Sequence, residues 1–167
     1  MKTHQITVID KLLKKNGFIS KLRSQEDGDD SSCIMLSLPV DLQGRKREML
    51  IKIEEFEGIG HLKSAAGVQL ISILPFSLIA GTEQATIQAV NFFNRGLPSP
   101  VFVFDEALRK VFVKYSFLTP AEGATKEMFI PLLRSLILWM DAGSEPIERV
   151  AAGEDLLNVI ENSLSET

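Results

Sequence analysis

The segment Val68–Tyr115 constrains the fold more than any other part of the chain. It contains an apolar strand pattern that ends in ILPF, a helical pattern from Thr82 to Arg95 that closes on Gly96, and the hairpin pattern VFVFDEALRKVFVKY. Strand alternation, helical spacing and turn residues therefore follow one another in a fixed order. Few of these residues are chemically reactive, so the segment predicts an architecture and argues against catalysis.

Length and charge limit the class of protein. The chain has 167 residues, 45% of them hydrophobic, and a net charge of −4. We expect a single domain, residues 1–167, with a core at about 5–142 and an additional C-terminal helical segment at about 146–163. An acidic balance argues against nucleic acid as a partner. The basic run Arg45-Lys46-Arg47 follows Gly44, and we interpret it as a solvated turn.

Cysteine content and hydropathy bear on the compartment. Cys33 is the only cysteine, which excludes an intramolecular disulfide framework and favours a reducing compartment. It lies in an apolar strand, where a buried structural thiol is commoner than a nucleophile. The longest apolar run, Leu132–Met140, is too short to cross a bilayer. We therefore expect a cytoplasmic protein with no membrane insertion.

The first half of the chain predicts one helix and three strands. Apolar residues recur at helical spacing near Gln5–Asn16, and Phe18–Leu22 is a candidate short strand. In Glu48–Glu54, Met49, Ile51 and Ile53 alternate with Glu48, Leu50, Lys52 and Glu54, as in a half-solvated antiparallel strand. The other two strands are Cys33–Leu38 and Val68–Leu74, the second preceded by a glycine-bearing loop, Glu57–Gly67.

The second half predicts a helix, a hairpin and a long helix. We expect Thr82 to cap the helix that ends at Gly96, with Gly96 in the left-handed conformation. Val101–Phe104 is apolar throughout, which predicts burial on both faces, and Asp105–Lys110 is the loop leading to Val111–Phe117. Thr119-Pro120-Ala121-Glu122 has capping-box spacing. The long helix is expected at Lys126–Asp141, with Gly143 and Pro146 breaking the chain after it. The fold class is therefore α+β, a helix, three strands, a helix, two strands and a helix forming a mostly antiparallel sheet packed by helices.

No motif for a cofactor, a metal or a reaction stands out. The chain has two histidines, far apart in sequence, so zinc is not expected. Asp27-Gly28-Asp29-Asp30 lacks the glycine at the sixth position and the glutamate at the twelfth position that a calcium loop requires. Gly58-Ile59-Gly60-His61 lacks the lysine of a phosphate loop. Asp105 and Glu106 are adjacent and should point apart, which is unsuitable for an acid–base pair. We expect no cofactor and no metal.

Apolar residues in excess of the core indicate a partner surface. Met128, Leu138 and Trp139 lie off the main apolar stripe of the long helix, and the hairpin is rich in phenylalanine. The candidate partner-binding or dimer surface comprises Phe102, Phe104, Phe112, Met128, Leu138 and Trp139.

The series ILPF, AVNFFNRGLPSPVFVFDEALRKVFVKYSF and LLRSLILWMDA resembles the YbjN-like proteins, which share the fold of type III secretion chaperones. Asn94, Phe102 and Asp105-Glu106 stand where that family has a helix-ending asparagine, an aromatic strand and an acidic turn, and Asp141-Ala142 fits its last helix. The resemblance covers roughly residues 5–142. It implies a small dimeric protein without enzymatic activity that binds an unfolded segment of a secreted effector, or a regulator. The helix after Gly143 and the long Glu57–Gly67 loop depart from the secretion chaperones.

Three functions follow in order of preference. The first is a non-catalytic, homodimeric module that binds a polypeptide partner, either a secreted effector or a regulatory protein. The alternative is a small-ligand-sensing or signalling regulator of the YbjN-like type, with a pocket between the sheet and a helix. An enzyme is third, because no cluster of acid, base and nucleophile was found.

Overall fold

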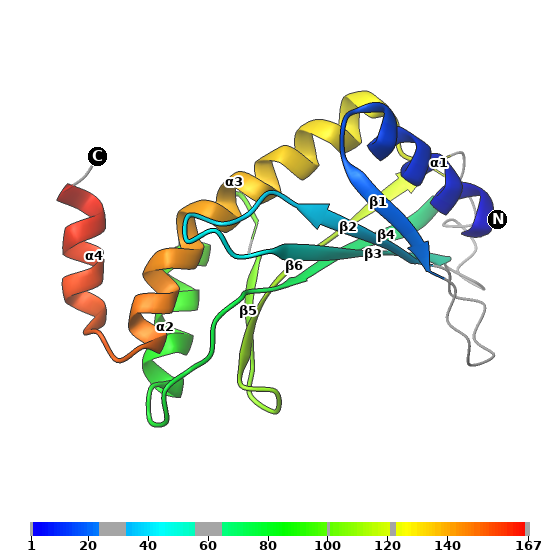
Figure 1. Ribbon diagram of the computed structural model, residues 1–167. Coiled ribbons are helices and arrows are strands. Elements are labelled where there is room, and N and C mark those ends of the chain that lie inside the picture. Colours follow the sequence, from blue (N-terminus) through cyan, green and yellow to red (C-terminus); the bar gives the residue numbers. More distant parts are fainter. Residues whose placement is uncertain (1, 24–32, 56–64, 100, 121–122, 166–167) are drawn as a thin grey trace. The chain divides into compact units, whose positions relative to one another are not determined.

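The computed structural model describes residues 2–23, 33–55, 65–99, 101–120 and 123–165 (Figure 1). Within these ranges the chain forms helices and strands in a mixed order. The helices are α1 (Lys2–Lys15), α2 (Glu83–Arg95), α3 (Lys126–Ala151) and α4 (Leu156–Ser165). The strands are β1 (Ile19–Arg23), β2 (Cys33–Leu38), β3 (Arg47–Glu55), β4 (Ala65–Ile73), β5 (Phe102–Asp105) and β6 (Lys110–Pro120).

The strands form a single six-stranded sheet in the order β1-β2-β3-β4-β6-β5. The pairs β1–β2, β2–β3, β3–β4 and β5–β6 are antiparallel. The prediction of an α+β fold with a mostly antiparallel sheet is confirmed. The candidate strand at Phe18–Leu22 is present as β1, so that four strands precede α2 instead of three.

Contacts within the chain cluster into two compact units. Unit 1 comprises residues 1–72 and 115–135, and unit 2 comprises residues 73–114 and 136–167. The strands β4 and β6 and the helix α3 each contribute to both units. The expectation of one domain stays a prediction, and the two units are described separately below.

Unit 1 packs helices against one face of its part of the sheet. Alternate residues of β2, β3 and β4 are buried on that face, and α1 contacts β1, β2 and β3. Phe129 of α3 adds an aromatic contact with Phe117 of β6, with ring centroids 6.2 Å apart. A buried polar link joins α1 to β1, because the Ser20 hydroxyl donates to the Asp10 carboxylate at 2.6 Å. The alternation in the sequence thus produces a one-sided core.

Unit 2 packs α2 against the β5–β6 hairpin, and Asn94 fixes the contact. The Asn94 Oδ1 accepts hydrogen bonds from the backbone N–H groups of Val101 and Phe102, both at 3.0 Å, and its Nδ2 donates to the Phe102 carbonyl at 2.8 Å. Because Lys114 N–H bonds to the Val101 carbonyl, the alternation of an antiparallel ladder turns the backbone groups of Phe102 away from β6. The Asn94 amide therefore satisfies the outer edge of β5 where a further strand would otherwise pair.

The predicted break at Gly143 and Pro146 is wrong, because α3 continues through both residues to Ala151. A Cβ atom at Gly143 would lie 2.4 Å from Cζ of Phe102, so glycine allows the aromatic ring to pack directly on the helix. Its role is close approach and not chain termination. The break occurs instead at Gly153, which has a φ of +95° and separates α3 from α4.

Other predicted ends also differ from the structure. Thr82 and Gly96 flank α2 at its N- and C-terminal ends as predicted, but Gly96 has a φ of −82° and is not left-handed. The Thr82 hydroxyl does not cap the helix and donates instead to the carbonyls of Ile79 and Ala151. Pro120 is the last residue of β6, so the predicted helix start there is wrong. Val103 is 44% exposed, so the face of β5 to which it points is not covered, which corrects the expected burial on both faces.

The basic run is only partly solvated. Lys46 is exposed, whereas Arg47 is 3% exposed and its guanidinium donates to the carbonyl of Pro39 at 3.0 Å. The Arg45 Nε donates to the Asp41 carboxylate at 2.6 Å. The acidic loop at Asp27–Asp30 and most of the Glu57–Gly67 loop lie outside the described residues, while Gly67 itself belongs to β4.

Candidate functional site

The six residues predicted as a partner surface are divided between the two units, and those in the hairpin are divided between its two faces. Phe102, Phe104, Phe112, Leu138 and Trp139 belong to unit 2, whereas Met128 belongs to unit 1. In the hairpin, Phe102 lies opposite Val113 and Phe104 opposite Val111, so these two phenylalanines point to one face of the hairpin. Phe112 lies opposite Val103 and points to the other face.

Burial separates these six residues further. Phe102 is 3% exposed and belongs to the core of unit 2, so its ring is not part of an exposed surface. Leu138 is 65% exposed, whereas Phe104, Phe112, Met128 and Trp139 are half-buried. As a partner surface, the set stays a prediction, with Phe102 in a supporting position.

The outer face of the β5–β6 hairpin presents an apolar pair, of which only Phe112 belongs to the predicted partner surface. Val103 and Phe112 are direct cross-strand neighbours, Val103 being 44% exposed and Phe112 half-buried. Cross-strand neighbours on one face lie about 4.5–5.5 Å apart at Cβ, so the two side chains form a contiguous patch. We call these two residues the hairpin patch. Val103 was missed because an apolar strand was interpreted as buried on both faces.

A hollow in unit 2 lies beside α2 and the hairpin. It has a volume of about 460 Å³ and is lined by Gly81, Glu83, Gln84, Ile87, Phe104, Glu106 and Arg109. An ion pair joins the helix to the hairpin loop, because Arg109 contacts the Glu83 carboxylate at 2.5 Å. Arg109 has a φ of +49°, a conformation that costs free energy for a residue with a Cβ atom. The hollow thus combines an aromatic ring with charged groups.

The electrostatics of this hollow are those of a surface ion pair. The pKa of Glu83 is lowered, chiefly by a hydrogen bond from its own backbone N–H, against burial, which raises it, and with Arg109 contributing further. The Gly81 N–H also donates to the Glu83 carboxylate, at 2.9 Å. Glu83 is therefore a carboxylate at neutral pH, and no proton-transfer role follows from its pKa.

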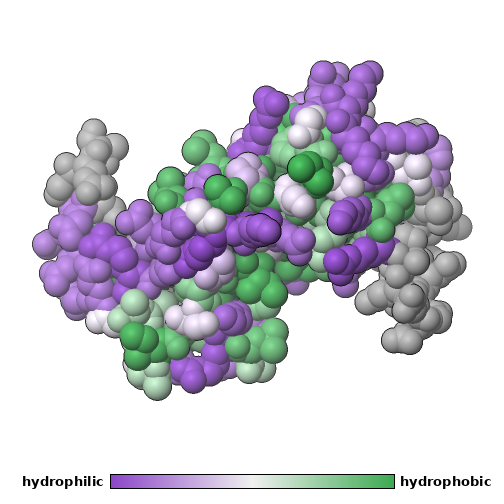
Figure 2. Space-filling view, in the orientation of Figure 1, coloured by the Kyte–Doolittle hydropathy of each residue, from purple (hydrophilic) through white to green (hydrophobic). Residues whose placement is uncertain are grey.

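Unit 1 presents a second candidate surface, the face of its sheet opposite the helices. Residues that alternate with the buried ones point to this face, and most of them are half-buried or exposed. We call this surface the open sheet face. Its members are Met35 on β2, Glu48, Leu50, Lys52 and Glu54 on β3, Gly67, Gln69 and Ile71 on β4, and Ser116 and Leu118 on β6. Elsewhere on the chain too, apolar side chains reach the surface among hydrophilic ones (Figure 2).

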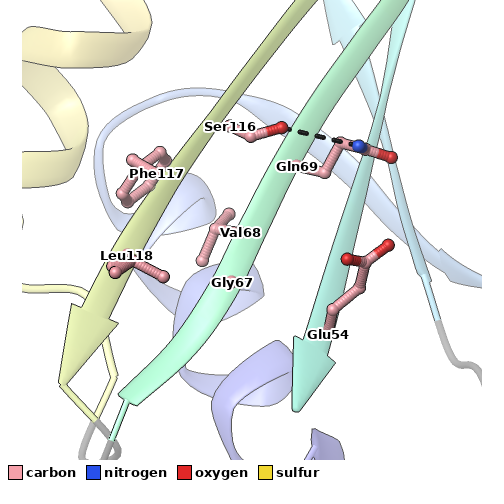
Figure 3. A pocket seen from close by; sticks show the side chains of 7 residues that line it. All are labelled: Glu54, Gly67, Val68, Gln69, Ser116, Phe117 and Leu118. Atoms are coloured by element: carbon pink, nitrogen blue, oxygen red, sulfur yellow. Dashed lines mark hydrogen bonds between the residues drawn. The ribbon is translucent and has the colours of Figure 1, made fainter. Parts of the chain in front are cut away.

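A smaller hollow lies at one end of the open sheet face (Figure 3). Its volume is about 160 Å³, and Gly67 contributes no side chain to fill it. Glu54 stands at its rim, and the Gln69 amide donates to the Ser116 hydroxyl at 3.4 Å across β4 and β6. The remaining lining residues, Val68, Phe117 and Leu118, are apolar. This arrangement can accept an apolar or cationic group, and it holds no pair of groups suited to acid–base chemistry.

Other candidates for chemistry have structural roles in the described residues. Cys33 is free and buried, as predicted for a structural thiol. The Asp105 carboxylate accepts a hydrogen bond from the Leu108 N–H at 2.8 Å and so shapes the hairpin loop. The described residues contain no group of three or more potential metal ligands, and no helix among them is long and apolar enough to span a membrane.

No family model matches the chain, and a search of curated proteins finds no match either.

Proposed function

We propose that this protein is a non-catalytic interaction module, resembling a type III secretion chaperone, that binds a polypeptide partner and acts as a homodimer in the cytoplasm. The observation that carries the proposal is the hairpin patch of unit 2, where Val103 is 44% exposed beside Phe112. Exposed apolar side chains that gather on one face of a hairpin are surfaces on which other chains dock. The free, buried thiol of Cys33 agrees with a reducing compartment.

The rigidity of the hairpin supports this proposal. Asn94 holds the start of β5 through three hydrogen bonds, and the Lys110 ammonium donates to the Phe76 carbonyl at 3.0 Å and to the Ser77 hydroxyl at 2.8 Å. A surface that is fixed before binding loses less conformational entropy when a partner docks. The hairpin patch is therefore a preorganised apolar surface.

The experiment compares partners retained by the wild-type chain and by a Val103→Ser/Phe112→Ser variant from extracts of the native cell. A polypeptide that binds the wild type and is lost from the variant supports the proposal. The control is Leu108→Ser, which changes a 62% exposed side chain in the adjacent hairpin loop and should retain the partner. Retention by all three proteins, or by none, contradicts a role for the hairpin patch.

A second function is favoured by the hollow of unit 2. Its volume of about 460 Å³ and its lining by Phe104, Ile87 and charged groups suit a small-ligand-sensing regulator. A thermal-shift screen with small charged metabolites tests this alternative. A ligand that raises the melting temperature of the wild type but not that of Phe104→Ala would support the regulator over the polypeptide-binding module.

A further inference from the structure

We propose that the open sheet face of unit 1 is the interface of the homodimer, with two copies stacked face to face and their β3 strands antiparallel. This inference rests on the homodimer of the proposed function and names the surface that forms it. The occupant of the face is a second copy of the same chain. Two features of β3 and its neighbours lead to this assignment, namely a self-complementary charge pattern and an apolar row through its centre.

The charges along β3 are antisymmetric about Leu50. Glu48, Leu50, Lys52 and Glu54 alternate with buried residues and share the open sheet face, and exposed Lys46 precedes them at the same spacing. Reversing the strand about Leu50 places Glu48 opposite Lys52 and Lys46 opposite Glu54. Both pairs then have opposite signs. A two-fold interface requires such a pattern, because each surface must be complementary to itself.

These four charged side chains have no competing partner within the copy. The side chains of Lys46, Glu48, Lys52 and Glu54 form no ion pair and no hydrogen bond in the part of the chain that the structure describes. A second copy can therefore pair with them without breaking an existing contact. In the stacked arrangement each of the two pairs occurs twice, which makes four ion pairs around one centre.

An apolar row crosses the strands at the same centre. The strand register places Met35 opposite Leu50, and Leu50 opposite Ile71, so that three half-buried apolar side chains lie in line across β2, β3 and β4. A two-fold axis along this row, perpendicular to the strands, reverses β3 and brings each residue of the row onto its own counterpart. Stacked sheets lie about 10 Å apart with nearly aligned strands, which suits apolar contact in the centre.

The periphery of the arrangement is polar. Lys21 of β1 is the neighbour of Met35 in the register and ends the row at the edge of the sheet, where its long side chain can reach solvent. Gln69 and Ser116 lie beside the row toward the hollow at Gly67. An apolar centre surrounded by charged and polar groups is the usual anatomy of a protein interface.

The test is sedimentation equilibrium of the purified full-length chain with single and paired charge reversals. Glu48→Lys and Lys52→Glu each place like charges at two symmetry-related positions, and each should weaken the dimer about tenfold or more. The double variant Glu48→Lys/Lys52→Glu restores opposite charges and should return the dissociation constant to within about threefold of the wild type. Leu50→Asp should give a monomer, since it places two carboxylates at the apolar centre.

The matched controls are Glu145→Lys and Lys11→Glu, which make the same charge changes at exposed positions on α3 and α1. They should leave the dimer unchanged. Thermal denaturation checks that the variants remain folded. If a single reversal unfolds the chain, the double reversal decides the test, because it has the same amino-acid composition as the wild type. A wild-type monomer, or a double reversal that fails to restore association, overturns the proposed interface.

This outcome is separable from the function proposed above. If the wild type is dimeric and none of the open-face substitutions weakens it, the interface is elsewhere and the polypeptide-binding proposal stands. If a polypeptide other than this chain is released by Leu50→Asp while the wild type remains monomeric, the open sheet face binds a foreign partner and the self-association proposal fails. If the dimer follows the charge reversals but the hairpin-patch variant retains every partner, the interface stands and the partner site fails.

Discussion

At the scale of single residues, Asn94 links helix α2 to the edge strand β5 by hydrogen bonds. Its amide makes three hydrogen bonds to the backbone of Val101 and Phe102, with lengths of 2.8–3.0 Å. The helical pattern predicted a helix that ends at Arg95, and α2 does end there, with Asn94 in its last turn. Its bonds across to β5 could not be predicted, because they depend on how the two elements pack.

Asn94→Ala should lower the free energy of unfolding by about 2–3 kcal/mol, because three part-buried hydrogen bonds are lost. Urea denaturation measures this change. Asn94→Asp is the informative control, since its carboxylate can still accept from the two N–H groups but cannot donate to the Phe102 carbonyl. Equal stability of Asn94→Ala and the wild type would show that the edge of β5 does not depend on this amide.

Gly143→Ala should destabilise the chain by about 1–3 kcal/mol, although alanine usually favours a helix. The reason is steric, since the new Cβ atom would lie 2.4 Å from Cζ of Phe102. Thermal denaturation checks the prediction, and Phe102→Leu should recover part of the loss when it is combined with Gly143→Ala. A stabilised single variant would contradict the close packing of this ring on α3.

At the scale of elements, alternation in the sequence predicted strands better than glycine and proline predicted helix ends. The strand Cys33–Leu38 is found with its predicted bounds, and the residues predicted to share one face, Ile34, Leu36 and Leu38, are all buried. Gly143 and Pro146 were interpreted as helix breakers, yet α3 passes through both because its buried face contacts the rest of unit 2. Tertiary packing therefore overrides the local preference.

The turn between β2 and β3 is held by Asp41. Its Oδ1 accepts from the N–H groups of Gln43 and Arg45, at 3.0 and 2.7 Å, and its Oδ2 accepts from the Arg45 Nε at 2.6 Å. Asp41→Ala should therefore lower the free energy of unfolding by about 1–3 kcal/mol. Chemical denaturation tests this, with Leu42→Ser as the control, since that side chain is 79% exposed and its loss should change stability by less than about 0.5 kcal/mol. Comparable losses for both variants would contradict the bracing role of Asp41.

At the scale of the whole molecule, the candidate surfaces differ in how far the sequence could predict them. The sequence predicted β3 as an amphipathic strand with alternating charges. The symmetry of these charges indicates an interface only together with the strand register, which aligns Met35, Leu50 and Ile71. The hollow beside α2 could not be predicted, because its lining residues come from separate segments. The hairpin patch was half predicted, through Phe112, because whether a face of β5 is covered depends on tertiary packing that the apolar run of the strand does not show.

The stability of the molecule should fall in acid through three carboxylates. Burial raises the pKa of Asp41, but hydrogen bonds from Arg45 outweigh it and lower the pKa below 3.8. The pKa values of Glu83 and Glu154 are lowered below 4.5, Glu83 chiefly by its own backbone N–H and Glu154 by a hydrogen bond from Arg149. Because the folded-state pKa values are the lower ones, their stabilisation is present above pH 4.5 and is lost as the pH falls through the folded values.

Urea midpoints measured between pH 7 and pH 3 test this acid dependence. The wild type should lose stability below about pH 4.5, and an Asp41→Asn/Glu83→Gln/Glu154→Gln variant should lose less over the same interval. If the urea midpoint falls equally with pH for the two proteins, other carboxylates control acid unfolding.

The most direct test of the binding function is an equilibrium titration of the purified chain with the polypeptide that it retains from its own cells. We expect saturable binding that weakens at least tenfold in the Val103→Ser/Phe112→Ser variant, while both proteins unfold at the same temperature. Binding of equal strength by the two proteins, or a partner that is chemically converted during the titration, would contradict a non-catalytic polypeptide-binding module that uses the β5–β6 hairpin.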